Sequence, residues 1–190
     1  IKLDDTSTFL TNLLTKTDNF LEDHGIRRDR LWGKGISMPG LINAQYGINQ
    51  TYLSLTKPGE PLAHRIQEQF QRPICLINDT RATTIGEHRF GLAKEKSHVL
   101  TINSDWGIGL GILLNGEVFN GASGYAGEVG HIQVRPDGIL CHCGKIGCLD
   151  TVVSAMALIR QAQEGIKAGR VSILPQMVQG NIETLDTHHV

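Results

Sequence analysis

Three cysteines lie within eight residues of this chain, in the stretch CHCGKIGCLD at residues 141–150. The spacing C-x-C-x4-C keeps Cys141, Cys143 and Cys148 close together in any fold. A disulfide framework needs paired cysteines, and the remaining one, Cys75, lies far away in an apolar stretch where we expect it to be buried. Three thiolates and one imidazole form a common structural zinc site. The cluster therefore predicts bound Zn2+.

The fourth ligand is expected to be a histidine, and the sequence offers two. His142 stands between two cysteines, whose chelation would point it away from the ion. His131 precedes Cys141 by ten residues and can fold back across the segment IQVRPDGIL. We therefore expect His131 to complete the site, with Gly144 and Gly147 letting the backbone wrap around the ion. The alternative is a group of reduced surface cysteines without metal.

Composition excludes several classes of protein. The 190 residues are 40% hydrophobic and 19% charged, which is typical of a globular chain. The longest apolar runs, such as residues 109–114, are too short to cross a bilayer, and no signal peptide is visible. The four cysteines then favour a reducing, cytoplasmic compartment. Because the first methionine is Met38, we expect the chain to be a fragment.

The balance of charge argues against direct DNA contact by this segment. The formal net charge is −1, and the densest basic cluster, GIRRDR at residues 25–30, is interrupted by Asp29. A nucleic-acid-binding face usually has a clear excess of Lys and Arg. Any DNA-reading part is therefore expected to lie outside this sequence.

Apolar periodicity predicts an α/β fold. Helices are expected over residues 6–25, 60–71, 80–91 and 151–169, and strands over 31–40, 73–79 and 97–104, followed by a hairpin over 107–121. Helices that alternate with strands favour a mostly parallel sheet with crossover connections.

From about residue 31 onward the sequence resembles the ROK family, which contains bacterial sugar kinases and sugar-responsive repressors. The family pattern is Gly-Glu-x-Gly-His, followed after a short interval by Cys-x-Cys-Gly-x-x-Gly-Cys-Leu-Glu. This chain has GEVGH at 127–131 and CHCGKIGCLD at 141–150, with Asp150 where the family usually has Glu. The resemblance extends through GISMPGLIN (35–43), INDTRATTIGEHRFG (77–91) and GIGLGILLNGEVFNGASG (107–124).

The resemblance implies an actin-like, ribonuclease-H-like fold of two α/β lobes with a sugar bound between them. Residues 1–82 would form part of the N-terminal lobe and residues 83–190 part of the C-terminal lobe. The matching zinc ligands are His131, Cys141, Cys143 and Cys148. The matching sugar-hydroxyl ligands are Asn78, Asp79, Glu128, His131 and Asp150. Carboxylates and amides suit rows of hydroxyls, and an imidazole can bind a metal through one nitrogen and a sugar through the other.

Three of these polar residues also have a purely structural alternative. An Asn-Asp pair at the end of a strand often caps the next helix, which is the alternative role of Asn78 and Asp79. Glu128 taken alone would be an ordinary loop carboxylate. The position of Asn78 and Asp79 at the carboxyl end of an apolar strand favours function, because ligand sites in α/β proteins gather there.

A kinase and a repressor of this family differ at the glycine-rich phosphate loop. Active family kinases tend to have Gly-Thr-Gly-x-Gly-Gly-Gly, and the aligned run here is DWGIGLG at residues 105–111. Trp106 replaces a hydroxyl, Asp105 adds negative charge and Leu110 fills a glycine position, all of which disfavour polyphosphate. A dinucleotide-binding motif is rejected, because the apolar run that follows is of the β type.

The favoured hypothesis is the effector-binding region of a sugar-responsive regulator, most like the NagC/XylR/Mlc-type members. It would be a homo-oligomer that binds a sugar or sugar phosphate, and an N-terminal helix-turn-helix outside this sequence would bind operator DNA. The alternative is a hexose or N-acetylhexosamine kinase that uses ATP and Mg2+, with Asp79 as the general base. A metal-stabilised scaffold with neither activity is the third possibility.

Overall fold

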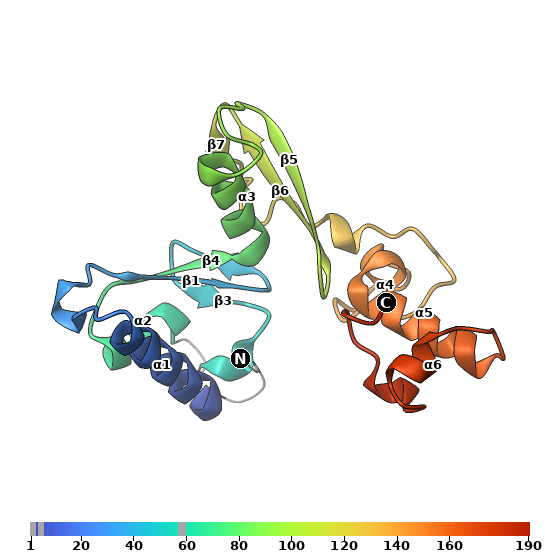
Figure 1. Cartoon of the computed structure of the whole chain (residues 1–190). Helices are drawn as coiled ribbons and strands as arrows, with labels where there is room; N and C mark the ends of the chain where they lie inside the picture. Colours follow the sequence, from blue (N-terminus) through green and yellow to red (C-terminus); the bar gives the residue numbers. More distant parts are fainter. Residues whose placement is uncertain (1–2, 4–5, 57–59) are drawn as a thin grey trace. The chain divides into compact units, whose positions relative to one another are not determined.

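The computed structural model describes residue 3 and residues 6–56 and 60–190. It contains helices and strands in alternation, which confirms the α/β class (Figure 1). The chain divides into two compact units, the first formed by Ile1–Leu92 and Asn120–Tyr125, and the second by Ala93–Phe119 and Ala126–Val190. The lobe ranges 1–82 and 83–190 stay a prediction. Within the described part of the chain, no helix combines the length and apolar character that a membrane span requires.

The first unit is built around a pair of parallel strands. The strands β1 (Lys34–Met38) and β4 (Ile74–Asn78) pair in parallel, with Lys34 opposite Ile74 and Met38 opposite Asn78. The chain between these strands forms the short hairpin β2 (Ile42–Asn43) and β3 (Ile48–Asn49), a 3-10 turn (Leu53–Leu55) and α2 (Leu62–Phe70). The flanking helices are α1 (Thr6–Asp23) and α3 (Asp79–Phe90).

One face of the β1–β4 pair carries the core of this unit. Ile36, Met38 and Leu76 point to that face and are buried, and Phe9 of α1 and Ile66 of α2 pack into the same cluster. The alternation of side chains along a strand sends the intervening residues to the opposite face. The apolar periodicity of α1 and α2 therefore reports the surfaces with which they cover this sheet.

Two expectations about this unit are wrong. Cys75 is exposed rather than buried, because it lies on the outer face of β4, opposite Gly35, which has no side chain to cover it. Nor is the sheet mostly parallel, since β1–β4 is the one parallel pairing among the described strands. Apolar runs report burial, but they do not report the direction of the partner strand.

The second unit begins with an antiparallel sheet. The strand β5 (Val99–Ser104) pairs with β6 (Ile108–Leu114), and β6 pairs with β7 (Glu117–Val118), as the hairpin expected over 107–121 requires. A loop with a 3-10 turn at Val129–His131 leads to the cysteine cluster. The remaining elements are α4 (Asp150–Val153), α5 (Ala155–Lys167), α6 (Leu174–Met177) and a 3-10 turn (Ile182–Thr184).

The long helix expected over residues 151–169 is broken at Ser154. This residue is extended (φ −68°, ψ 163°), and its side chain accepts a hydrogen bond from the amide of Ala157, so it caps α5. Serine is a favoured N-cap residue because its oxygen satisfies an amide that has no partner within the helix. The break separates α4, which follows the cysteines directly, from α5.

Candidate metal centre and its surroundings

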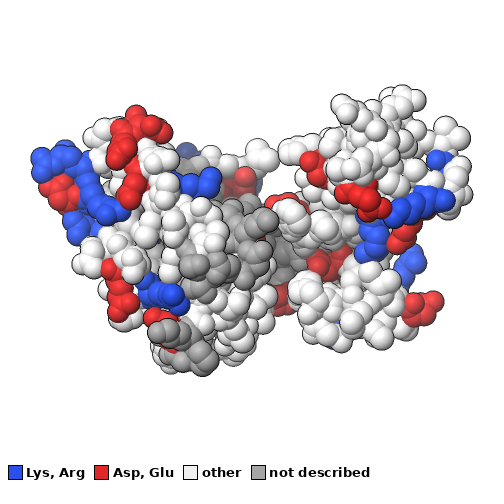
Figure 2. Space-filling model, turned by 90° about the horizontal axis from the view of Figure 1, so that it is seen from below, with Lys and Arg blue, Asp and Glu red and all other residues white. Residues whose placement is uncertain are grey.

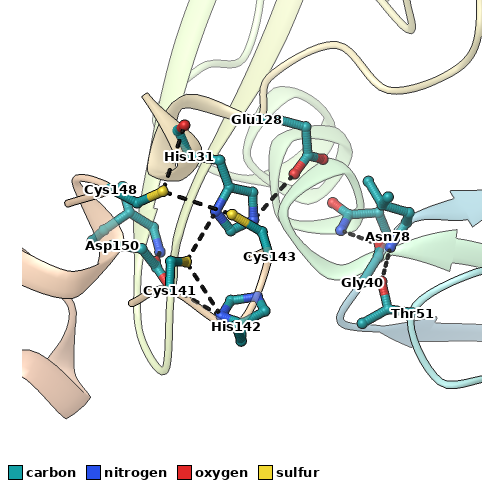
Figure 3. Close-up of polar contacts among 12 residues, drawn as sticks. Gly40, Thr51, Asn78, Glu128, His131, Cys141, His142, Cys143, Cys148 and Asp150 are labelled. Carbon is teal, nitrogen blue, oxygen red and sulfur yellow. Dashed lines mark hydrogen bonds and ion pairs between the residues drawn. The ribbon is translucent and has the colours of Figure 1, made fainter. Parts of the chain in front are cut away.

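The structure brings together the four residues expected to bind metal. One ligand atom from each of His131, Cys141, Cys143 and Cys148 lies within 4.8 Å of every other, and these residues can hold a metal ion (Figure 3). The Sγ atoms of Cys143 and Cys148 are 3.7 Å apart, and Cys141 Sγ lies 3.7 Å from His131 Nδ1. A tetrahedral zinc ion separates two sulfur ligands by about 3.8 Å, and a sulfur from a nitrogen by about 3.6 Å, given its usual bond lengths. The spacing therefore fits zinc.

Backbone contacts of the loop position the cysteines. The amide of Cys141 donates to the carbonyl oxygen of Lys145 (2.7 Å), which closes a tight turn around Cys143. Gly147 has φ +72°, and its amide donates to the carbonyl of Ile139. A side chain at Gly147 would place Cβ only 1.5 Å from the carbonyl oxygen of Arg135. The glycine is therefore required for the approach of two chain segments as well as for the turn.

His131 presents its two ring nitrogens to different groups. Nδ1 faces Cys141, and Nε2 lies 3.9 Å from a carboxylate oxygen of Glu128, as the close-up in Figure 3 shows. The main-chain oxygen of His131 accepts a hydrogen bond from Lys145 Nζ (2.6 Å). A metal on Nδ1 would leave the proton of the ring on Nε2, directed at the carboxylate.

His142 is close to the cluster but is the more exposed histidine. Its Nδ1 lies 3.7 Å from Cys141 Sγ and 3.9 Å from Asp150 Oδ2, and its side chain is 65% exposed, against 24% for His131. Cys141, His142 and Asp150 form a second group whose atoms are close enough for a metal, but they supply only three ligands. Four ligands favour the group that contains His131, because structural zinc sites are closed and tetrahedral.

The thiols of the cluster differ in their readiness to ionise. Burial raises the pKa of Cys148 to about 11, and the hydrogen-bonded thiols of Cys143 and Cys141 act in the same direction. Burial opposes ionisation of Cys143 as well, but the Lys145 amide, the neighbouring thiols and the Lys145 charge together hold its pKa below the ordinary value. Because a metal binds thiolates, loading must release protons, and acid must weaken it.

Asn78 and Asp79 lie at the junction of β4 and α3 in the first unit. Asn78 Oδ1 accepts from the amide of Arg81 (3.2 Å), and its Nδ2 donates to the carbonyl of Gly40 (3.2 Å). Asp79 accepts a hydrogen bond from the amide of Thr80 (2.7 Å). Asn78 therefore has the capping role, and one amide hydrogen and one lone pair remain for another partner.

Asn49 is a positioning residue that sequence patterns did not reveal. It is buried (3% exposed), its Nδ2 donates to the carbonyl of Pro39, and its Oδ1 accepts from the amides of Thr51 and Tyr52. These bonds fix the loop that carries Gly40, the partner of Asn78. A polar residue at a core-facing position of a short strand is the one signal that could have identified it.

Comparison with known proteins places the chain in a family. Residues 3–189 match the profile described as the ROK family. The chain belongs to the ROK family. The resemblance carried by the GEVGH and cysteine segments is confirmed, and the structural neighbours of this ROK chain share the actin-like sugar kinase fold.

Curated relatives of the ROK chain include both enzymes and regulators. A glucokinase of Halalkalibacterium halodurans is 34% identical over 91% of this chain and 53% of its own length. A xylose repressor of Caldicellulosiruptor bescii is also 34% identical, over 72% of this chain and 34% of its own length. This chain therefore spans about half or less of the length of these relatives.

A solved relative confirms the fold. The structure of a ROK family glucokinase from Streptomyces griseus, in complex with glucose and AMPPNP, has 26% identity and a TM-score of 0.85. The match covers 98% of this chain and 59% of the glucokinase.

Proposed function

We propose that this ROK chain is the effector-binding region of a sugar-responsive transcriptional regulator, and that its cysteine cluster holds a structural Zn2+. The observation that carries the regulator proposal is the turn between β5 and β6, at the position where the family's kinases have a phosphate loop. The spacing of the four candidate ligands supports the metal, and the family supports the sugar.

Two amides of the β5–β6 turn are not available to a phosphate. The amide of Asp105 donates to the carbonyl of Gly107 (3.0 Å), and the amide of Ile108 donates to Asp150 Oδ1 (2.6 Å), so both are already engaged. The Asp105 carboxylate would repel a polyphosphate, and the bulky residue Trp106 is 71% exposed at the turn. Phosphate loops need free amides and no local negative charge. These features favour a regulator over a kinase.

Operator DNA would be bound by a segment outside this chain. Within the densest basic cluster, Arg27 and Asp29 form an ion pair of 2.5 Å, and Arg28 pairs with Asp18. Basic and acidic side chains are interspersed on the face drawn in Figure 2. An evenly mixed surface is a poor match for the phosphate backbone.

The proposed sugar contacts of the second unit surround His131. With Nδ1 on the metal, His131 would direct Nε2–H to a sugar hydroxyl, and Glu128 would accept hydroxyl protons through its carboxylate, whose side chain is 42% exposed. Asp150 would contribute through Oδ2, since its Oδ1 accepts from Ile108. The metal would fix the tautomer and orientation of His131.

The proposed sugar contacts of the first unit are Asn78 and Asp79. Both lie at the carboxyl end of β4, where polar groups of α/β proteins meet their ligands. The bond from Asn78 to Gly40 orients the amide. Sugar binding would then bias a two-state equilibrium of a homo-oligomer and lower its affinity for operator DNA, provided that the sugar prefers one state.

An ATP-dependent sugar kinase is the second candidate, and the position of Asp79 favours it. Asp79 is the first residue of α3. Burial of Tyr52 raises the pKa of that residue, and the negative charge of Asp79 raises it further. A carboxylate at this place can accept the proton of an attacking hydroxyl, with ATP and Mg2+ as co-substrate and cofactor. The glucokinase relatives give this candidate further support.

Glu128→Gln tests the sugar site with little risk to the fold. We expect affinity for the sugar to fall roughly 10- to 100-fold, because hydrogen bonds to a charged acceptor contribute about 1.5–3 kcal/mol. The melting temperature without sugar should stay close to that of the parent. A panel of hexoses and N-acetylhexosamines, followed by thermal shift and then calorimetry, provides the measurement.

The matched control is Glu117→Gln, which removes an exposed carboxylate from β7 in the same unit. It should leave affinity for the sugar unchanged. Equal affinity of the parent and Glu128→Gln for a bound sugar would contradict the assignment of Glu128.

A further inference from the structure

The backbone of β6 lies directly against the loop that leads to the metal ligands. The amide of Leu110 donates to the carbonyl of Gly127 (3.1 Å). A Cβ atom at Gly127 would lie 1.9 Å from the carbonyl oxygen of Leu110, and one at Gly130 would lie 2.4 Å from that of Ile108. Two glycines of the GEVGH segment therefore permit this contact. The last residue of that segment is the candidate ligand His131.

Asp150, which follows the cysteine cluster in the sequence, contacts the beginning of the same strand. It follows the ligand Cys148 by two residues and is buried (9% exposed). Its Oδ1 accepts a hydrogen bond of 2.6 Å from the amide of Ile108, the first residue of β6. A Cβ atom at Gly107 would lie 3.0 Å from the same oxygen, so the carboxylate is packed closely against the turn.

A second hydrogen bond holds the opposite end of the turn. The amide of Ala155, the first residue of α5, donates to the carbonyl of Asp105 (3.0 Å). Residues 105–107 are thus tied at both ends to the short segment that begins at Cys148. Trp106 lies between the two hydrogen-bonded residues Asp105 and Ile108 and is largely exposed.

We propose that Asp150 is a positioning residue that couples metal occupancy of the cysteine cluster to the conformation of the β5–β6 turn. Loading the cluster fixes Cys148, and the segment of residues 148–155 then holds the turn through Asp150 and Ala155. In the metal-free protein that segment loses its anchor, and the turn gains freedom. The inference rests on the metal site proposed above and adds a structural consequence of its occupancy.

Trp106 provides a reporter at the turn itself. The chain has two tryptophans, and Trp32→Phe leaves Trp106 as the single fluorophore. The full chain is stripped of metal with a chelator and titrated with Zn2+, while bound zinc is counted and the fluorescence anisotropy of Trp106 is measured. Because Trp106 stays exposed in the ordered turn, we expect a loss of side-chain motion and therefore a rise in anisotropy as zinc binds. In Asp150→Ala, zinc should still bind, but most of the rise in anisotropy should be lost.

Three further variants separate coupling from general damage. Asp150→Asn keeps an oxygen acceptor for the Ile108 amide and should retain the response. Asp137→Ala removes an exposed carboxylate from the segment between His131 and Cys141 and should behave like the parent. Ala155→Pro removes the donor to Asp105 and places a ring carbon against the same carbonyl, so it breaks this contact. Proline is tolerated at the first position of a helix, and Ser154 already has a compatible backbone conformation. This variant should weaken the response.

The outcomes distinguish the coupling from the metal site. Failure of the parent to bind zinc overturns the metal site and the coupling together. Zinc binding without any change in Trp106 overturns the coupling alone. A full response in Asp150→Ala and Ala155→Pro also overturns it, and Ala155→Pro decides the question if Asp150→Ala does not fold.

Discussion

Cys148→Ser is expected to lower affinity for zinc by more than about 100-fold. Loss of a residue that only hydrogen-bonds to a metal ligand typically lowers metal affinity about 10- to 100-fold, and loss of a direct ligand should cost more. Cys148 is fully buried and 3.7 Å from Cys143 Sγ. The melting temperature with zinc present should fall to that of the metal-free parent, since binding to the folded state is what stabilises it. A chromophoric chelator competed against each protein measures the affinity.

Cys75→Ser is the matched control for this loss. It makes the same chemical change at an exposed cysteine outside the cluster. Zinc affinity and melting temperature should both equal those of the parent. If Cys148→Ser bound zinc as tightly as Cys75→Ser, the proposed ligand set would be wrong.

Of the two glycines in the cysteine segment 141–148, Gly147 is expected to tolerate substitution by alanine less well. The added Cβ would lie 1.5 Å from the Arg135 carbonyl oxygen, at a residue with φ +72°. A left-handed conformation alone costs a side chain about 1–2 kcal/mol, and the clash forces two backbone segments apart in addition. We expect a loss of more than about 3 kcal/mol in stability, at the high end of single substitutions. Chemical denaturation of the zinc-loaded proteins measures it.

Gly144→Ala separates the two causes. Gly144 also has positive φ (+89°), but a Cβ there meets no atom within 4 Å. The free energy of unfolding of Gly144→Ala should therefore fall only by the conformational cost, about 1–2 kcal/mol. Equal losses in the two variants would show that the approach of Gly147 to Arg135 is unimportant.

The helices and the longer strands were predictable because their signals are local. Apolar patterns identified α1, α2, β4 and α3, and the hairpin of β6 with β7 lies within the predicted range 107–121. The exposure of Cys75 was not predictable, since it depends on which face of β4 lacks a covering layer. The direction of strand pairing likewise depends on the partner strand, so it cannot be predicted from a single apolar segment.

The grouping of the four candidate metal ligands was predictable because they are close in sequence. Spacing alone brought three cysteines together, and the structure places His131 with them as expected. The contacts of Asp150 could not be foreseen in the same way. Its partner Ile108 lies 42 residues earlier, and the bond is made to a backbone amide, so no side-chain pattern records it. Ser154 lay inside an apolar helical pattern, and its capping role was visible only in the backbone.

The regulator proposal is tested most directly by ATP-dependent phosphorylation of a panel of hexoses and N-acetylhexosamines. The intact protein and its Asp79→Asn variant are compared for ADP release and sugar phosphate, with thermal shift run on the same sugars. We expect no turnover from either protein and a rise in the melting temperature with one sugar. Turnover by the parent that disappears in Asp79→Asn would contradict the proposal and establish a kinase with Asp79 as its base.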